Sequence, residues 1–155
     1  MKRITRREAL FAVVGVAGTV YSANAQQPIK VEVYKDPTCG CCGLWVAHLR
    51  AHGFVPTVTD TPNMTQVKDR SHIPAQLRSC HTALVGGYVI EGHVPAADVQ
   101  RLLTEKPKVL GLAVPGMPVG SPGMEGPGGR PYDVLTFDAA GKTTVYSTQQ
   151  PSSRA

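Results

Sequence analysis

The feature that most constrains this chain is a set of three cysteines within four positions, Cys39, Cys41 and Cys42. Residues 30–34, just upstream, alternate and are rich in β-branched and aromatic side chains, which is typical of a strand. Residues 43–52 favour a helix and follow at once. The sequence therefore predicts a strand that leads directly into a helix whose first turn carries several thiols.

The rest of the chain extends this unit in a regular order. Residues 55–59 favour a second strand, where Pro56 indicates an irregular or edge position. Asn63 or Thr65 should cap a short helix that ends at about His72. Two apolar runs flank Gly86-Gly87, which predicts a tight hairpin, and a last helix should begin at Pro95. This β-α-β-α-β-β-α order predicts an α/β fold of the thioredoxin-like class.

Residues 107–131 are dense in proline and glycine, and we expect them to form a loop without regular structure. A loop this long is usually functional or disordered. Residues 132–137 and 143–148 read as a second hairpin. We therefore expect one domain over residues 26–148, with a flexible tail over residues 149–155.

Residues 1–25 have the three-part layout of a cleavable export signal. A basic start precedes the apolar residues 9–20, and Ala23-Asn24-Ala25 fits a cleavage site. The pair Arg6-Arg7 indicates a twin-arginine signal, although ordinary secretion would also use such charge. The apolar stretch is shorter than the about 20 residues of a membrane span. We expect a periplasmic protein without stable membrane insertion after signal removal.

The charge of the chain gives little support for nucleic-acid binding. The formal net charge is +5, of which the first eight residues supply +3 through four basic and one acidic side chain. The remaining 12 basic and 10 acidic residues leave only +2, without a basic run interleaved with aromatics. We therefore expect no nucleic-acid partner.

The fourth cysteine, Cys80, lies just before the predicted third strand. In a thioredoxin-like fold that position is beside the start of the first helix, so all four thiols should converge. Two main interpretations stay open at this point, besides an iron–sulfur centre and inert thiols. An exported protein with an even number of cysteines commonly forms disulfides, such as a Cys39–Cys42 redox pair. The same thiols could instead hold a metal.

The chemistry of a metal site here favours copper. Thiolates are soft ligands that suit Cu(I), and a helix start lowers thiol pKa values. The neighbours Cys41 and Cys42 cannot easily chelate one small ion, but they can bridge two ions. The cluster therefore predicts a polynuclear Cu(I) site rather than a structural zinc site, which uses spaced pairs.

Several histidines and methionines are weaker candidates. His93 follows the hairpin, and Met117 and Met124 each follow a glycine in the long loop; imidazole and thioether both suit copper. Strand alternation would turn His81 away from Cys80, unless the chain turns at this point. His48 and His52 lie one helical turn apart, and we expect them on a solvated face.

Four blocks of this sequence resemble the CopG-type copper-resistance proteins, which are distinct from the ribbon–helix–helix repressors of the same name. The blocks are Cys39–Trp45, Ser79–Ala83, Gly87–Pro95 and Gly111–Glu125. The resemblance implies a periplasmic thioredoxin-like protein that binds copper ions and contributes to copper resistance. Other periplasmic copper-handling proteins are candidate partners. It implies core ligands at Cys39, Cys41, Cys42 and Cys80, with His93, Met117 and Met124 nearby. Copper storage, copper oxidoreductase activity and thiol–disulfide exchange on proteins all remain open.

Overall fold

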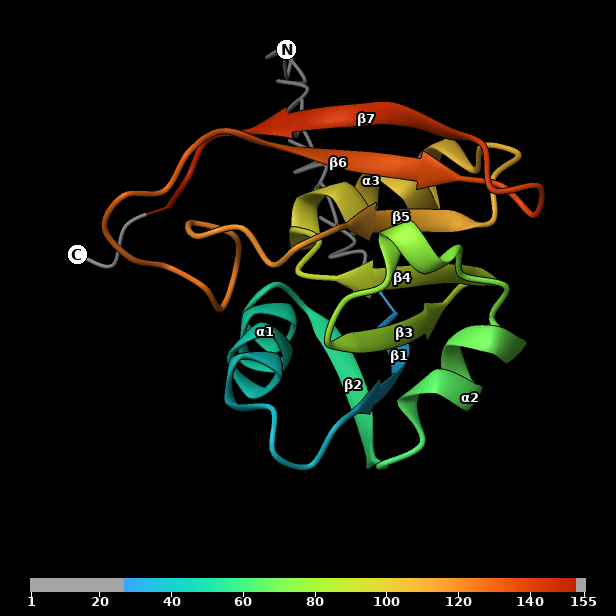
Figure 1. Cartoon of the computed structure of the whole chain (residues 1–155), viewed down its shortest axis with the longest axis horizontal. Helices are drawn as coiled ribbons and strands as arrows, with labels where there is room; N and C mark the ends of the chain where they lie inside the picture. The colour runs from blue at the N-terminus through green and yellow to red at the C-terminus, as the bar shows by residue number, and fades with distance from the viewer. Residues whose placement is uncertain (1–26, 153–155) are drawn as a thin grey trace, which may run out of the picture.

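The computed structural model describes residues 27–152, so the predicted export signal lies outside the described residues. Seven strands form one mixed sheet in the order β2-β1-β3-β4-β5-β6-β7 (Figure 1). The elements are β1 (Ile29–Lys35), α1 (Gly40–Ala51), β2 (Phe54–Asp60), α2 (Met64–Arg70), a 3-10 turn (Ala75–Leu77), β3 (His81–Val85), β4 (Tyr88–Gly92), α3 (Ala96–Glu105), β5 (Gly111–Val114), β6 (Tyr132–Phe137) and β7 (Thr143–Gln149).

The first part of the chain has the predicted thioredoxin-like order, from β1 to α3. β1 pairs in parallel with β2 and antiparallel with β3, which places the end of β1 beside the start of β3. β2 is an edge strand, as Pro56 predicts. Gly86 and Gly87 have φ values of 56° and 85° and form the tight turn between β3 and β4.

Apolar side chains fill both faces of the sheet. The larger cluster joins α1 and α3 to the sheet, and includes Trp45, Leu49, Leu102 and Ile90. A smaller cluster packs Leu77 and its neighbours against the opposite face. Successive residues of β4 contribute to opposite clusters because strand side chains alternate. The sheet is thus a central layer packed on both faces, and the cysteines lie near one end of it, at the start of α1 and just before β3.

The expectation of an unstructured segment over residues 107–131 is wrong for Gly111–Val114. These residues form β5, which pairs in parallel with β4 and antiparallel with β6. A Cβ atom at Gly111 would lie 1.8 Å from the Val89 carbonyl oxygen, so glycine permits the close pairing. The sequence contains no sign of this strand because four residues are too few to show the alternation of a strand. Through β5, the predicted β6–β7 hairpin extends the sheet.

The end of the described chain also differs from the expected mobile tail. Gln149 is the last residue of β7 and pairs with Tyr132. The N–H and the hydroxyl of Ser152 both donate to the Gly120 carbonyl, at 2.9 and 2.8 Å. The chain end is therefore anchored to the long loop up to Ser152.

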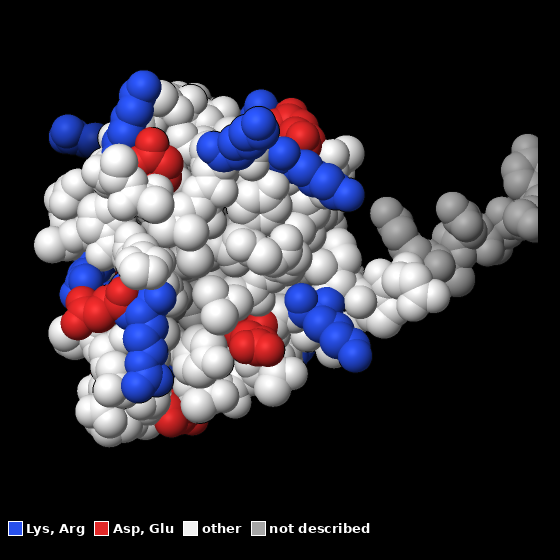
Figure 2. Space-filling view, turned by 90° about the vertical axis from the view of Figure 1, so that its right-hand side faces the viewer, with Lys and Arg blue, Asp and Glu red and all other residues white. Residues whose placement is uncertain are grey.

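The surface carries mixed charge. Figure 2 shows lysine and arginine side chains interspersed with aspartate and glutamate on one side of the molecule. Within residues 27–152, no helix has both the length and the apolar character needed to cross a membrane.

Candidate metal centre

The start of α1 presents three cysteines on one turn. Cys39 is the N-cap residue, with an extended backbone, and its N–H donates to the Asp36 carbonyl at 3.1 Å. The Asp36 carboxylate accepts from the Thr38 N–H at 2.8 Å, which fixes the turn before the helix. Cys39 and Cys42 are joined as a disulfide, and Cys41 is a free thiol.

Cys80 reaches the same place from the other side, immediately before β3. The four sulfur atoms all lie within 4.8 Å of one another. Two sulfurs bound to one ion at about 2.3 Å each are separated by at most about 4.6 Å. The sulfurs thus converge as the topology predicts, at a spacing close to that of shared metal ligands.

Two buried histidines adjoin Cys80. The Sγ atom of Cys80 lies 3.2 Å from His93 Nε2 and 3.4 Å from His81 Nδ1. Both rings are fully buried. The His81 ring packs against Trp45, with 4.2 Å between ring centroids, and Trp45 donates its indole N–H to the Val94 carbonyl at 2.8 Å. Contacts with buried neighbours therefore set the orientation of these rings.

Burial controls the protonation states of Cys80, His81 and His93. Burial, followed by the neighbouring Cys41, raises the pKa of the Cys80 thiol to about 11. Burial likewise lowers the pKa of His81 and of His93 below the ordinary value. At neutral pH Cys80 is a thiol and both imidazoles are neutral. An ion that binds Cys80 must therefore displace a proton from it, whereas the imidazoles are already in the ligand form.

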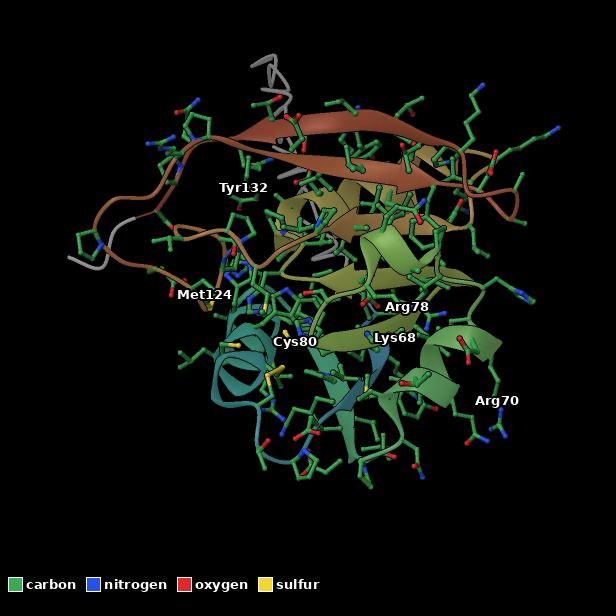
Figure 3. All side chains as sticks on the ribbon, in the orientation of Figure 1. Lys68, Arg70, Arg78, Cys80, Met124 and Tyr132 are labelled. Carbon is green, nitrogen blue, oxygen red and sulfur yellow. A yellow bond between two sulfur atoms is a disulfide. The ribbon has the colours of Figure 1, made fainter. Side chains whose placement is uncertain are left out.

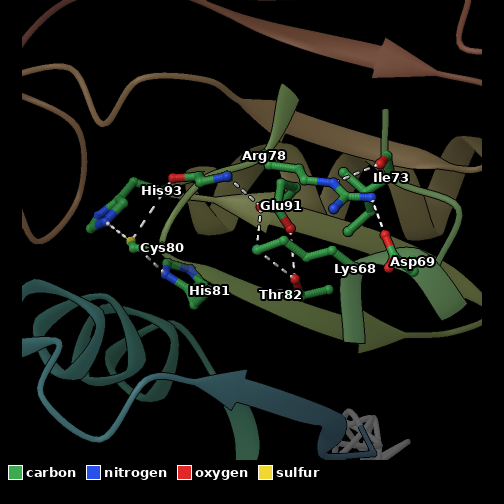
Figure 4. A network of polar contacts seen from close by, with 10 residues as sticks. Lys68, Asp69, Ile73, Arg78, Cys80, His81, Thr82, Glu91 and His93 are labelled. Carbon is green, nitrogen blue, oxygen red and sulfur yellow. Dashed lines mark hydrogen bonds and ion pairs between the residues drawn. The ribbon is translucent and has the colours of Figure 1, made fainter. Parts of the chain in front are cut away.

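A buried charge network holds the segment before Cys80. The Glu91 carboxylate on β4 accepts from Lys68 Nζ at 2.6 Å, from the Thr82 hydroxyl at 2.7 Å and from the Ser79 N–H at 2.5 Å (Figure 4). Glu91 is fully buried and Lys68 is 5% exposed. Because the carboxylate has three donors, its burial is compensated. The network ties the main chain beside Cys80 to the centre of the sheet.

The long loop packs against the other side of the cluster. A Cβ atom at Gly123 would lie 2.8 Å from the Trp45 amide nitrogen and 3.0 Å from the Cys41 carbonyl oxygen. The next residue, Met124, therefore lies close to the start of α1, and Figure 3 shows it on the loop beside the helix. The loop also reaches His93, whose Nδ1 lies 2.7 Å from the Pro122 carbonyl oxygen.

Two solved structures match nearly the whole described part of this chain. They carry the names copper resistance protein CopG form 1 and form 2, and each is 42% identical to this chain with a TM-score of 0.75. The matches cover 80% and 79% of this chain and 99% of each solved chain. The chain belongs to the CopG family. A family model described as a protein of unknown function, DUF411, matches residues 77–124, and no curated protein matches.

The CopG-like blocks of the sequence lie together in space. The first and second supply the four cysteines, and the third contains Glu91 and His93. The fourth forms β5 and the loop that carries Met117 and Met124. Met117 is 37% exposed and has a φ of 47°. The structure thus places His93 in contact with Cys80, Met124 near the helix start, and Met117 at the surface of the loop.

Three residues of this CopG-family site were not anticipated. His81 was expected to face away from Cys80, but β3 begins at His81, so strand alternation does not apply across this pair. Lys68 and Glu91 lie 23 residues apart, and sequence gives no sign that they pair. The one available signal was a glutamate inside the predicted hairpin strand, where a buried charge needs a partner.

His48 and His52 do not form the open pair that their spacing suggests. His48 Nε2 accepts from the Ala96 N–H at 3.1 Å and so caps the start of α3. The His52 Nδ1 donates to the His48 carbonyl at 2.7 Å. Burial, with a smaller contribution from His52, lowers the pKa of His48 to about 4. The expectation of a solvated face therefore holds for exposed His52 but not for His48.

Proposed function

We propose that this protein binds copper through the thiolates of Cys39, Cys41, Cys42 and Cys80, as a copper-resistance protein of the periplasm. The observation that carries the proposal is the convergence of four sulfurs within 4.8 Å. The membership of the chain in a family with copper-resistance proteins supports the choice of metal. His93, Met117 and Met124 are proposed accessory ligands, with His93 best supported by its contact with Cys80.

The bound form we propose is a thiolate-bridged group of Cu(I) ions. Cys41 and Cys42 are adjacent in the sequence. Each of their sulfurs can bridge two ions more easily than both sulfurs can bind the same ion. Thiolates favour Cu(I) among the available copper states. Because Cys39 and Cys42 share a disulfide in the structure, reduction must precede four-thiolate binding.

The same disulfide supports a copper oxidoreductase role. Two Cu(II) ions would each accept one electron from the Cys39 and Cys42 thiols, which form the S–S bond and release two protons. The products are two Cu(I) ions and the disulfide. Cys41 and Cys80 remain as free thiols, so they can retain Cu(I) after the reaction.

Copper titration of the reduced protein tests the proposal. Under anaerobic conditions, we expect more than one Cu(I) per chain, counted against a chromophoric Cu(I) chelator. The double variant Cys41→Ser/Cys42→Ser should lose the multiple binding. Ser79→Ala removes only a long hydroxyl contact of 3.9 Å to Cys80 Sγ and should retain the multiple binding. One or fewer Cu(I) per chain in the unmodified protein would exclude the polynuclear site.

A second candidate is thiol–disulfide exchange on proteins, which the Cys39–Cys42 disulfide at a helix start favours. Such an enzyme would reduce insulin with a dithiol regenerant and would need Cys39 and Cys42 only. The copper proposal instead expects that Cys80→Ser strongly weakens copper binding. Full insulin reduction together with weak Cu(I) binding would favour the exchange enzyme.

The periplasmic location is part of the proposal and rests on the sequence of residues 1–25. Fractionation of cells that express the full chain tests it. Export should be lost when the apolar segment is interrupted by charge. Export that depends on Arg6 and Arg7 would assign the twin-arginine route, whereas export of an Arg6→Lys/Arg7→Lys variant would assign general secretion.

A further inference from the structure

The chain end beyond β7 crosses the long loop that follows β5. Pro151 lies between two glycines of that loop, because an added Cβ atom at either Gly120 or Gly129 would overlap the Pro151 Cβ. Ser152 follows, and its N–H and hydroxyl both donate to the Gly120 carbonyl, at 2.9 and 2.8 Å. Figure 1 shows this end of the chain beside the loop. Residues 150–152, which we call the strap, therefore join two parts of the loop.

The strap is fixed at its base. Gln149, the last residue of β7, is paired with β6 in the sheet. Its side-chain amide also donates to the carboxylate of Asp98 on α3 at 2.9 Å, and Asp98 is only 5% exposed. Only Gln150 separates this anchor from Pro151, and one residue spans at most about 3.6 Å. The strap therefore has little slack, and the sheet determines where it holds Gly120.

The part of the loop that the strap holds is one compact turn. The Gly120 N–H donates to the Met124 carbonyl at 2.8 Å, and the Met124 N–H donates to the Ser121 carbonyl at 2.8 Å. Ser121 is fully buried, and its N–H and hydroxyl both donate to the Pro118 carbonyl, at 3.1 and 2.7 Å. Because these bonds close the segment on itself, a shift of Gly120 must be shared by Met124 and its neighbours.

The other side of this turn contacts the cysteine cluster. A Cβ atom at Gly123 would lie 3.0 Å from the Cys41 carbonyl oxygen, and the Pro122 carbonyl accepts from His93 Nδ1 at 2.7 Å. The same turn is thus held by the strap at Gly120 and packed on the start of α1 at Gly123. A segment that covers a site must open locally before a bound ion can leave past it.

We propose that residues 150–152 are positioning residues that hold the turn of residues 118–124 over the cysteine cluster and so slow the release of bound Cu(I). This inference rests on the proposed function and adds control of release to it. The strap consists of glutamine, proline and serine, none of which supplies the thiol, imidazole or thioether that suits copper. It therefore acts through the loop, and the number of ions bound should not depend on it.

Transfer of Cu(I) to a chromophoric chelator tests the strap in the reduced, copper-loaded full chain. Gly129→Ala places a Cβ atom against Pro151 and 2.9 Å from the Val119 carbonyl oxygen, and should displace the strap. Release should then be about 10-fold faster, because the open state of the loop becomes more populated. The number of Cu(I) ions per chain should stay the same.

Gly126→Ala is the matched control in the same loop. Neither Gly126 nor Gly129 has a positive φ, and a Cβ atom at Gly126 would make an ordinary contact of 3.7 Å with Val119 Cγ1. This variant should release Cu(I) as the unmodified chain does. Equal release rates for Gly129→Ala and Gly126→Ala would overturn the inference. A strap with only a structural role would lower the unfolding midpoint of Gly129→Ala and leave its release rate unchanged.

A second pair of variants tests the hydrogen bonds of the strap. Ser152→Ala loses the hydroxyl bond to Gly120 but keeps the N–H, and should release Cu(I) about 3-fold faster. Ser152→Thr keeps a hydroxyl and should restore the original rate. Equal rates in these two variants would also overturn the inference. This pair decides the result if circular dichroism shows that Gly129→Ala does not fold.

Alkylation of Cys41 in the reduced, metal-free chain separates this inference from the proposed function, because it needs no copper. The reaction should be faster in Gly129→Ala than in Gly126→Ala. If the unmodified chain binds no Cu(I) but alkylation differs in this way, the copper proposal is rejected and the hold of the strap on the loop stands. If Cu(I) binds as proposed but release and alkylation are equal in the two variants, only the strap is rejected.

Discussion

The two segments that bring sulfur to the site are fixed in different ways. The start of α1 is shaped by its own sequence, through a turn in which Asp36 bonds to Thr38 and Cys39. The segment before β3 is instead held by Glu91 and Lys68, which are distant in sequence and buried. Local geometry thus places three cysteines, and the fold as a whole places the fourth. Each kind of support can be removed separately.

The largest expected effect comes from breaking the buried pair. Lys68→Met leaves the Glu91 carboxylate buried without its cation, and should lower the free energy of unfolding by about 3–5 kcal/mol. Urea unfolding measures the change, and mass spectrometry of alkylated peptides should show faster modification of Cys80.

The exposed pair of Arg101 and Glu105 provides the control for this variant. Arg101→Met should lower the free energy of unfolding far less than Lys68→Met does, since an exposed ion pair and an exposed cation–π contact with Tyr146 contribute little, and should leave the rate of Cys80 alkylation unchanged. A similar small effect for Lys68→Met would show that the buried pair does not support the Cys80 segment.

The next effect concerns the loop that covers the helix start. Gly123→Ala should cost about 2–3 kcal/mol, because it combines an unfavourable positive φ with close contact at Trp45 and Cys41. Gly128 has a similar φ of 80° but nothing within 4 Å of an added Cβ, which makes Gly128→Ala the matched control.

Thermal unfolding and the alkylation rate of Cys41 distinguish the two glycine variants. Gly123→Ala should be the less stable by about 1–2 kcal/mol and should expose Cys41 more. Equal behaviour of the two variants would mean that the loop does not shield the helix start.

Reduction of the Cys39–Cys42 bond tests the helix start itself. The closed loop is short, so the loss of the bond should lower the free energy of unfolding by only about 2 kcal/mol. Denaturant unfolding with and without a thiol reductant gives this difference, and Cys39→Ser/Cys42→Ser should show no response to the reductant. A loss of cooperative unfolding on reduction would instead make the disulfide essential to the fold.

The smallest effect is a pH dependence from His48. The unfolded chain binds a proton at this ring near pH 6.5, whereas the folded protein does so only near pH 4. The unfolded state therefore holds more protons between these values, so stability falls as the pH drops from 6.5 to 4 and then levels off. For this half-buried ring the loss should be about 1–2 kcal/mol.

His48→Gln can still accept from the Ala96 N–H but does not titrate. Urea unfolding across pH 4–7 should therefore show a shallower dependence in this variant, with the residual slope due to the other buried histidines. An unchanged slope would mean that His48 does not resist protonation in the folded state.

The sequence was sufficient for the features that depend on neighbouring residues. The strand before Cys39, the turn at Gly86-Gly87 and the element order all follow from local patterns, and the topology then brings Cys80 to the helix start. The β5 strand escaped prediction because its stability comes from pairing with β4 and β6. The Lys68–Glu91 pair and the orientation of His81 escaped it because they depend on packing between distant segments.

Glu91 reaches the segment beside Cys80 through the main-chain N–H of residue 79 rather than through a side chain. The hydrogen bond therefore does not depend on which side chain occupies position 79. Serine could give way to other small residues while the thiol keeps its place, and proline alone would sever the link, since it has no N–H to offer. The residue type at position 79 can therefore change while its main-chain atoms keep their place beside Cys80.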